Sequence, residues 1–231
     1  MITLQELENN INLVKATITN SAHQAGRNTD DITLVAVTKT IPVERIIEAY
    51  NLGITNFGEN YLQEALPKIE AFHPHDVSWH MIGHLQSNKA SKVIPNFEYI
   101  HTIDSLKLAQ KINHHVITVG KKTKILLQVN ISGETSKNGI SRKEILTIAQ
   151  AIAKCTHLEL VGLMTIPPFS ENPEVSRLVF RSLRLLRDEL QKEVPNSQLK
   201  HLSIGMSHDY AIAIEEGATI VRIGQALFGT R

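Results

Sequence analysis

The sequence predicts an α/β fold, a single (β/α)8 (TIM) barrel with an extra N-terminal helix. Eight β-rich runs alternate with amphipathic helical stretches, which is the pattern of parallel strands joined by crossover helices. The 231 residues are enough for one such barrel, at the small end of its size range. No low-complexity tract or long linker divides the chain, so we expect one domain over residues 1–231.

The chain begins with a predicted amphipathic helix. Its apolar residues recur at steps of three and four, which places them on one side of a helix; they are Leu4, Leu7, Ile11, Val14 and Ile18. This helix precedes the first predicted strand, so it is additional to the barrel.

After this helix, a β-rich run, a turn and an amphipathic helix follow one another repeatedly. We expect strands to begin near Ile32, Ile54, Val77, Tyr99, Lys124, Leu158, Leu199 and Thr219. We expect helices over Val43–Leu52, Glu59–Ala71, Gln86–Val93, Ser105–His114, Arg142–Lys154, Pro173–Glu193 and His208–Glu216. A final helix should be short or absent, because few residues follow Gly229.

Composition excludes several functional classes. The formal net charge of +1 gives no strong attraction to nucleic acid or to a membrane surface. One cysteine, Cys155, cannot form an internal disulfide and fits a reducing compartment. No basic-then-apolar leader and no membrane-length apolar run is present, so we expect a cytoplasmic protein. Without an interface signature, we expect a monomer.

Lys39 is the first candidate for chemistry. It follows the apolar run 32–38 and precedes a turn at Ile41-Pro42, which places it at the C-terminal end of a buried strand. Active sites of barrels lie at that end. A free ammonium there must find a partner or lose its charge, and such lysines form Schiff bases. A carboxylate partner at the barrel rim is the structural alternative.

Ser207 and Gly205 form the first candidate anion site. Ser207 precedes the predicted helix His208–Glu216, where its hydroxyl could simply cap the helix. The same position also suits a phosphate, which would meet the hydroxyl and the free N–H groups of the first helical turn. Gly205 would let the backbone approach closely. The residues alone leave both interpretations open.

Arg222, Gly224 and Gln225 form the second candidate anion site. A glycine-bearing turn after the last strand of a barrel often presents N–H groups to phosphate. Together with Lys39, two anion sites suggest pyridoxal 5'-phosphate (PLP) as the cofactor. A salt bridge at the barrel rim is the structural alternative for Arg222. In the PLP interpretation its guanidinium donates to the pyridine nitrogen and keeps it unprotonated, because arginine does not give up its proton. An unprotonated ring is a weak electron sink, which favours holding PLP over strong carbanion chemistry.

Two other patterns are interpreted as structural. His80 and His84 have a metal-like spacing but lack the helical His-Glu context of a metal site, so no metal is expected. Arginines also recur on one side of the helix Pro173–Glu193, which we interpret as a solvated face; they are Arg177, Arg181, Arg184 and Arg187.

Several sequence blocks occur together and in order along the chain. They are Phe57-Gly58-Glu59-Asn60-Tyr61, Trp79-His80-Met81-Ile82-Gly83-His84-Leu85-Gln86-Ser87-Asn88-Lys89, Gly162-Leu163-Met164-Thr165-Ile166-Pro167, Ser203-Ile204-Gly205-Met206-Ser207-His208-Asp209 and Val221-Arg222-Ile223-Gly224. In these blocks the chain resembles the pyridoxal phosphate homeostasis protein family over essentially its whole length. The resemblance implies a barrel related to the N-terminal domain of alanine racemase.

The resemblance also implies roles for individual residues. It implies that Lys39 carries PLP as an aldimine and that Arg222 faces the pyridine nitrogen. The phosphate would be held by Ser207 and by the backbone of Gly224 and Gln225. The residues expected near the cofactor, with no assigned role, are Asn60, His80 and Met164.

Two further positions are compared with the family. Ser136-Lys137-Asn138-Gly139 matches a family loop, which implies that Lys137 meets free PLP or substrate at the mouth of the barrel. Gln225 departs from the family, in which relatives often carry a small hydroxyl residue. If that hydroxyl contacts the phosphate, this chain loses one bond there and keeps the backbone donor.

The resemblance implies a PLP carrier or buffer in intracellular PLP homeostasis, without robust turnover, which exchanges PLP with PLP-dependent apo-enzymes. A weak PLP-dependent amino-acid racemase is the alternative. Racemisation needs acid and base on opposite faces of the substrate, and in alanine racemase the opposing tyrosine comes from a second domain, which we do not expect in a chain ending at Arg231. A sugar-phosphate barrel enzyme with a Lys39 Schiff base is a third hypothesis.

Overall fold

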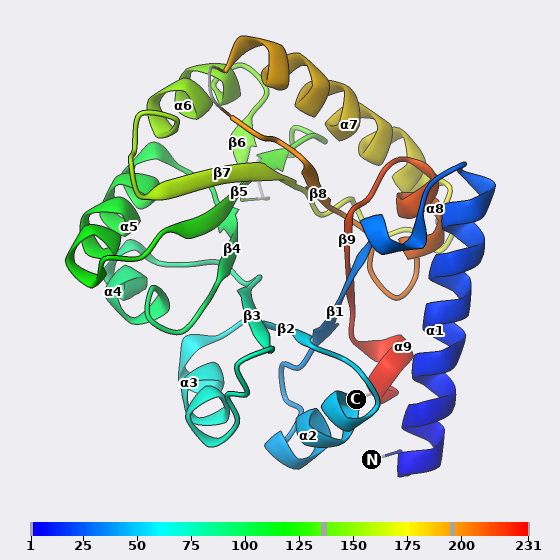
Figure 1. Ribbon diagram of the computed structural model, residues 1–231. Helices are drawn as coiled ribbons and strands as arrows, with labels where there is room; N and C mark the ends of the chain where they lie inside the picture. The colour runs from blue at the N-terminus through cyan, green and yellow to red at the C-terminus, as the bar shows by residue number, and fades with distance from the viewer. Residues whose placement is uncertain (1, 135–137, 195–196, 231) are drawn as a thin grey trace.

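Eight parallel strands form a closed ring in the computed structural model, which describes residues 2–134, 138–194 and 197–230 (Figure 1). The strands of the ring are β1 (Thr33–Val37), β2 (Asn56–Glu59), β3 (Ser78–Met81), β4 (Tyr99–Ile103), β5 (Thr123–Asn130), β7 (Leu158–Met164), β8 (His201–Ser203) and β9 (Ile220–Ile223). Pairing of β1 with β9 and of β4 with β5 closes the ring. The predicted (β/α)8 barrel is confirmed.

The helices lie outside the ring (Figure 1). They are α1 (Leu4–Gln24), α2 (Val43–Asn51), α3 (Leu62–Ala71), α4 (Ala90–Val93), α5 (Leu106–Val119), α6 (Ile145–Ile152), α7 (Val175–Glu193), α8 (Tyr210–Glu215) and α9 (Gln225–Phe228). The extra N-terminal helix is confirmed as α1, and the last helix is short, as expected. Helix α1 packs beside α8 and α9, so it covers the side of the barrel formed by the end of the chain.

Hydrogen bonds between Thr3 and Glu6 fix the start of helix α1. The Thr3 hydroxyl accepts a hydrogen bond from the Glu6 N–H at 3.2 Å, and the Glu6 carboxylate accepts one from the Thr3 N–H at 2.6 Å, which is a capping box. The predicted apolar side is buried at Leu7, Ile11, Val14 and Ile18, whereas Leu4 in the first turn is 52% exposed. Capping and burial therefore fix the position of the helix on the barrel.

Two local predictions are wrong, and one short strand was not predicted. Glu59 was expected to begin a helix, but it is the last residue of β2 and pairs with Met81 of β3, so α3 begins only at Leu62. The expected helix Gln86–Val93 is a 3₁₀ turn at Ser87–Lys89 followed by α4. A two-residue strand, β6 (Ile140–Ser141), pairs with β5 and was not expected.

Side chains alternate between the barrel interior and the layer beneath the helices. Val35, Leu126, Met164 and Ile220 form a small apolar cluster separate from the main core, as residues facing the interior would. Ala36 belongs to the main core, together with the apolar sides of the helices. This alternation decides which strand residues reach the mouth of the barrel.

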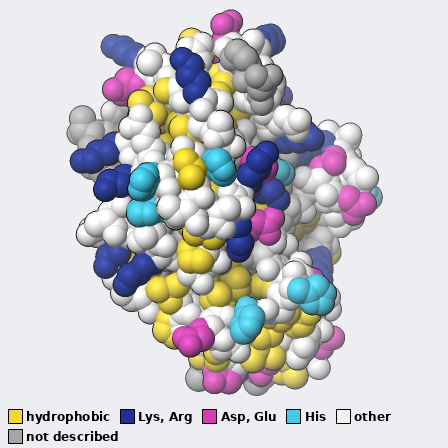
Figure 2. Space-filling model, turned by 60° about the vertical axis from the view of Figure 1, so that its left-hand side comes forward, with side chains coloured by type: hydrophobic (Ala, Val, Ile, Leu, Met, Phe, Trp, Pro, Cys, Tyr) yellow, Lys and Arg dark blue, Asp and Glu magenta, His cyan; other side chains and the backbone are white. Residues whose placement is uncertain are grey.

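Figure 2 shows one face of the molecule, on which basic and acidic side chains are interspersed. Within the described parts of the chain, no helix combines the length and the apolar character needed to span a bilayer.

Candidate functional site

The predicted site residues come from the C-terminal ends of neighbouring strands. Val37 of β1 pairs with Gly58 of β2, and Gly58 pairs with His80 of β3. On the other side of β1, Val35 pairs with Arg222 of β9. Lys39 therefore follows a strand whose two neighbours carry Asn60 and Arg222 at the same end of the barrel.

Lys39 lies in a tight turn just beyond β1. The Ile41 N–H donates to the Thr38 carbonyl at 2.9 Å, so Lys39 and Thr40 are the two central residues of this turn. Thr40 has φ of +62°, a left-handed conformation that is strained for a β-branched residue. Strain of this kind, about 1–3 kcal/mol, persists only where surrounding contacts hold the backbone.

A buried ion cluster holds both peptide groups that flank Lys39. The Lys68 ammonium donates to the Thr38 carbonyl at 2.7 Å, to Glu59 Oε1 at 2.8 Å and to Glu64 Oε1 at 2.7 Å. The same Glu64 oxygen accepts a hydrogen bond from the Thr40 N–H. Lys68 and Glu64 come from α3 and Glu59 from β2, so this cluster ties the Lys39 turn to the next βα unit.

Glu59 is the most buried member of this cluster, with no exposed surface. Burial raises the pKa of its carboxyl, and hydrogen bonds from Lys68 and Thr38 oppose that rise. Its Oε1 accepts from the Thr38 hydroxyl at 2.7 Å, while Oε2 finds no hydrogen-bond partner among the described residues. The sequence analysis missed both Glu59 and Lys68 as supports of the site.

The Lys39 amine itself is free. The residue is half-buried, and its amine makes no hydrogen bond or ion pair with any described residue. No carboxylate of the described residues pairs with Lys39, so these residues do not provide the rim ion pair that was the structural alternative. The Lys39 side chain is therefore available for a ligand at the barrel mouth.

Ser207 does not cap helix α8, which corrects one of the two interpretations left open by the sequence. The helix begins at Tyr210, and Asp209 occupies the N-cap position. The Ser207 hydroxyl instead accepts a hydrogen bond from the Ala226 N–H at 3.1 Å. That contact joins the turn after β8 to the turn after β9, the two segments in which the sequence predicts anion binding.

The backbone donors of the second turn are free. The N–H groups of Gly224 and Gln225 donate to no group in residues 2–134, 138–194 and 197–230. Gly224 is buried and Gln225 is exposed. Two free N–H groups beside a serine hydroxyl form a donor set that suits a phosphate.

Gly205 is required by this arrangement. It has φ of +91°, and a Cβ added there would lie 2.6 Å from Ala213 Cβ and 2.9 Å from Tyr210 Cα. The turn after β8 can therefore pack on α8 only with glycine at this position.

Arg222 lies inside the barrel and is 4% exposed. Its Nη1 donates to the Ser203 carbonyl and to the Ser203 hydroxyl, both at 2.6 Å, and its Nη2 donates to the Thr165 carbonyl at 3.3 Å. Burial lowers the pKa of Arg222 to about 10, with Asp209 opposing the change, so the guanidinium keeps its charge at neutral pH. One Nη2 hydrogen and the Nε–H remain for a ligand.

His80 and Met164 are fully inside the structure. Met164 has no exposed surface and belongs to the apolar cluster of the barrel interior. His80 is 1% exposed, and both of its ring nitrogens have partners, His101 Nε2 and Asn56 Oδ1, each at 3.0 Å. His84 is instead exposed and lies 3.2 Å from Asp104, so the two histidines do not share a site.

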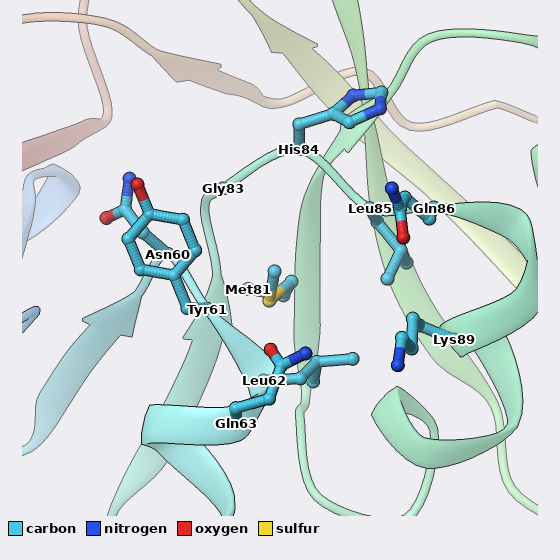
Figure 3. Close-up of a pocket in the computed structure, with 10 residues that line it drawn as sticks. All are labelled: Asn60, Tyr61, Leu62, Gln63, Met81, Gly83, His84, Leu85, Gln86 and Lys89. Atoms are coloured by element: carbon cyan, nitrogen blue, oxygen red, sulfur yellow. The ribbon is translucent and has the colours of Figure 1, made fainter.

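Two cavities touch predicted residues. One of about 400 Å³ has Asn60 and Tyr61 on one side, Gln86 and Lys89 on the other, and Met81 between them (Figure 3). The other, of about 530 Å³, is lined by Ser207 and Gln225 among others. The buried Asn60 Oδ1 has no hydrogen-bond partner among the described residues, so it is also available to a ligand.

Two other predictions from the sequence concern the arginines of α7 and Lys137. Arg177, Arg181 and Arg184 do not form a purely solvated face, because all three pair with Glu216, whose side chain is 4% exposed. This corrects the prediction for that side of α7. Lys137 lies outside the described residues.

The comparisons place the chain among known proteins. The family model described as "Alanine racemase, N-terminal domain" matches residues 2–231. The chain is 44% identical to a pyridoxal phosphate homeostasis protein of Aquifex aeolicus over 214 residues, which covers 93% of each chain. It is also 44% identical to the protein of that name from Homo sapiens, covering 86% of this chain and 76% of the other.

Solved structures show the same similarity. PipY of Synechococcus elongatus with PLP bound has a TM-score of 0.83 and 34% identity, covering 92% of this chain and 100% of that one. An unknown protein from Bifidobacterium adolescentis has a TM-score of 0.91 and 36% identity, covering 99% and 98%. An alanine racemase of Clostridium difficile shares the fold, with a TM-score of 0.77 at 20% identity, over 98% of this chain and 60% of that chain.

Proposed function

This chain belongs to the pyridoxal phosphate homeostasis protein family, and we propose that it binds PLP at the mouth of its barrel and acts as a reversible carrier of it. One observation carries the proposal. The Lys39 amine and the N–H groups of Gly224 and Gln225 have no partner among the described residues, and they lie at the same barrel end as the buried Arg222. In this proposal residues 1–231 act as one PLP-binding domain.

Lys39 would hold the cofactor covalently. PLP supplies an aldehyde, which forms a reversible imine with an amine. The tight turn at Thr38–Ile41 and the Lys68 cluster fix the backbone on both sides of Lys39, so the amine is presented from a rigid base. Rigid support lowers the entropic cost of holding a ligand.

The phosphate would lie between the turns after β8 and β9. The free N–H groups of Gly224 and Gln225 and the Ser207 hydroxyl supply the donors. The Ala226 N–H is already used by Ser207, so it orients the hydroxyl and is not counted as a donor. The Gln225 side chain is exposed and is not required for binding.

Arg222 would meet the pyridine nitrogen with its remaining N–H groups. Because the guanidinium stays protonated, it donates a hydrogen bond and does not pass a proton to the ring. An unprotonated ring accepts electrons weakly, and this favours storage and release of PLP over rapid turnover. Contacts of Asn60, His80 and Met164 with PLP stay predictions.

We further propose that the protein works in the cytoplasm as a monomer and exchanges PLP with PLP-dependent apo-enzymes. A reversible imine would protect the reactive aldehyde of PLP from other amines in the cell. Lys39 is half-buried and the next residue, Thr40, is exposed, which gives a recipient access to this turn at the barrel mouth.

The test is a titration with PLP followed by visible absorbance, with transfer of bound PLP to an apo-enzyme as a second readout. Wild type and Lys89→Ala should develop an imine band, whereas Lys39→Ala should not. Lys89 is a matched control, because it is also half-buried and without a partner among the described residues. An imine band in Lys39→Ala, or alanine racemisation at about 1–10³ s⁻¹ by wild type, would overturn the proposal.

A further inference from the structure

A continuous chain of hydrogen bonds crosses the interior of the barrel. Arg222 Nη1 contacts Ser203 Oγ at 2.6 Å, Ser203 Oγ contacts His101 Nδ1 at 2.8 Å, and His101 Nε2 contacts His80 Nδ1 at 3.0 Å. His80 Nε2 then contacts Asn56 Oδ1 at 3.0 Å. The chain runs from β8 and β9 across to β4, β3 and β2.

The groups at the two ends of this network, Asn56 and Arg222, determine which group donates in every hydrogen bond between them. Asn56 Oδ1 can only accept, so His80 Nε2 carries a hydrogen and, in a neutral ring, Nδ1 accepts from His101 Nε2. His101 Nδ1 must then accept from the Ser203 hydroxyl. Ser203 Oγ in turn accepts from Arg222, which is always a donor. One arrangement, with both rings neutral, satisfies all four bonds.

The surroundings of the chain favour neutral rings. His80 stacks on Tyr99, with ring centroids 4.5 Å apart and planes 4° from parallel. The ammonium of Lys124 lies 4.7 Å above the Tyr99 ring and pairs with Glu98, while His201 faces Tyr99 from another side. No carboxylate of the described residues contacts either ring, so an imidazolium would have no ion-pair partner there. Burial lowers the pKa of His80 and outweighs the charge of Glu98, which raises that pKa.

We propose that Ser203, His101 and His80 are positioning residues for Arg222, holding its Nη1 by this one-way chain so that its remaining N–H groups face the ligand. The inference rests on the proposed function, in which that ligand is PLP. Arg222 Nη1 donates both of its hydrogens to Ser203, one to the hydroxyl and one to the carbonyl. Buried chains of this kind orient a side chain when every member is satisfied.

The first test measures the tautomers and needs no PLP. Long-range ¹H–¹⁵N correlation spectra of the imidazole rings should show both His80 and His101 neutral from pH 8 to pH 5, with hydrogen on Nε2 and none on Nδ1. An Nδ1–H tautomer in either ring, or titration of either ring in this pH interval, would contradict the proposed arrangement of hydrogen bonds.

The second test measures PLP affinity. Ser203→Ala should weaken binding about three- to tenfold, because it removes both hydrogen bonds of the Ser203 hydroxyl, and one of these two positions Arg222. Ser21→Ala, the same change at a buried serine in α1 away from the barrel interior, should leave affinity unchanged.

A double substitution asks whether Ser203 acts through Arg222. In the Arg222→Gln background, Ser203→Ala should change PLP affinity by less than about twofold, because the group that it positions is gone. Additive losses overturn the proposal. If wild type binds no PLP, the proposed function fails, and the tautomers still decide whether the chain exists.

Discussion

At the scale of single residues, the ammonium of Lys68 holds the backbone beside Lys39 in place. Lys68 is 8% exposed and contacts three acceptors, including both carboxylates of its cluster. It offsets the charge of Glu59, which has no exposed surface. Removal of one partner from a buried pair leaves the other charge uncompensated.

Lys68→Met should therefore destabilise the fold by about 3–5 kcal/mol, measured by urea unfolding. Lys122→Met is the control, because Lys122 is 67% exposed and lies 3.9 Å from Glu159, and its loss should cost less than about 1 kcal/mol. Equal losses in the two variants would show that the buried cluster contributes nothing special to stability.

At this scale the sequence pattern points to residues at strand ends and not to the residues that support them. Lys39, Ser207 and Arg222 were predicted as site residues because each was placed near the C-terminal end of a strand, and their contacts with PLP stay predictions. Lys68 was missed because its acceptors lie up to 30 residues away. Its helical spacing to Glu64 was the only local signal.

At the scale of elements, the loops after β2 and β3 pack on each other. A Cβ added at Gly83 would lie 2.0 Å from the Asn60 carbonyl oxygen. Thr102 of β4 also donates to the Gly83 carbonyl at 2.7 Å, so the loop is held from both sides. Glycine at position 83 lets these two loops form the wall shown in Figure 3.

Gly83→Ala should force these loops apart, weaken PLP binding and lower the midpoint of urea unfolding. Gly120→Ala is the control, because nothing lies within 4 Å of its Cβ position and only its φ of +69° opposes the change. The control should cost about 1 kcal/mol and leave PLP affinity unchanged. Unchanged PLP affinity in Gly83→Ala would disprove the role of this contact.

Element types were more predictable than element ends. The eight strands and the N-terminal helix follow from hydrophobic periodicity. Glu59 was expected to begin a helix, but it ends β2, and the lysine that pairs with it lies on the following helix. The short strand β6 follows from pairing with β5, which local pattern does not encode.

At the scale of the whole molecule, polar groups that are distant in sequence meet across the barrel. His101 and Ser203 are 102 residues apart and were not predicted as site residues. The signal was present in strand alternation, because His101 follows Tyr99 at the two-residue step of an interior face. The partner across the ring could not be read from that pattern.

These buried histidines make stability depend on pH. Burial lowers the pKa of His80 to about 3 and the pKa of His101 well below the ordinary 6.5. The unfolded chain therefore binds more protons than the folded chain below about pH 6.5, and stability falls with pH in that range. Both histidines contribute to this loss of stability, by at most about 1 kcal/mol each per pH unit.

Urea unfolding between pH 7.5 and pH 5 should show this loss, and His101→Gln should show a shallower slope than wild type. The comparison separates His101 from other titrating groups, which both proteins share. Identical slopes would show that His101 is not held neutral in the fold.

The central claim is that Lys39 holds PLP. It is tested most directly by borohydride reduction of the PLP-loaded protein, followed by peptide mapping. The account predicts one pyridoxyl group, on the peptide that contains Lys39, and none on Lys68 or Lys89. A label on another lysine, with Lys39 unmodified, would contradict it.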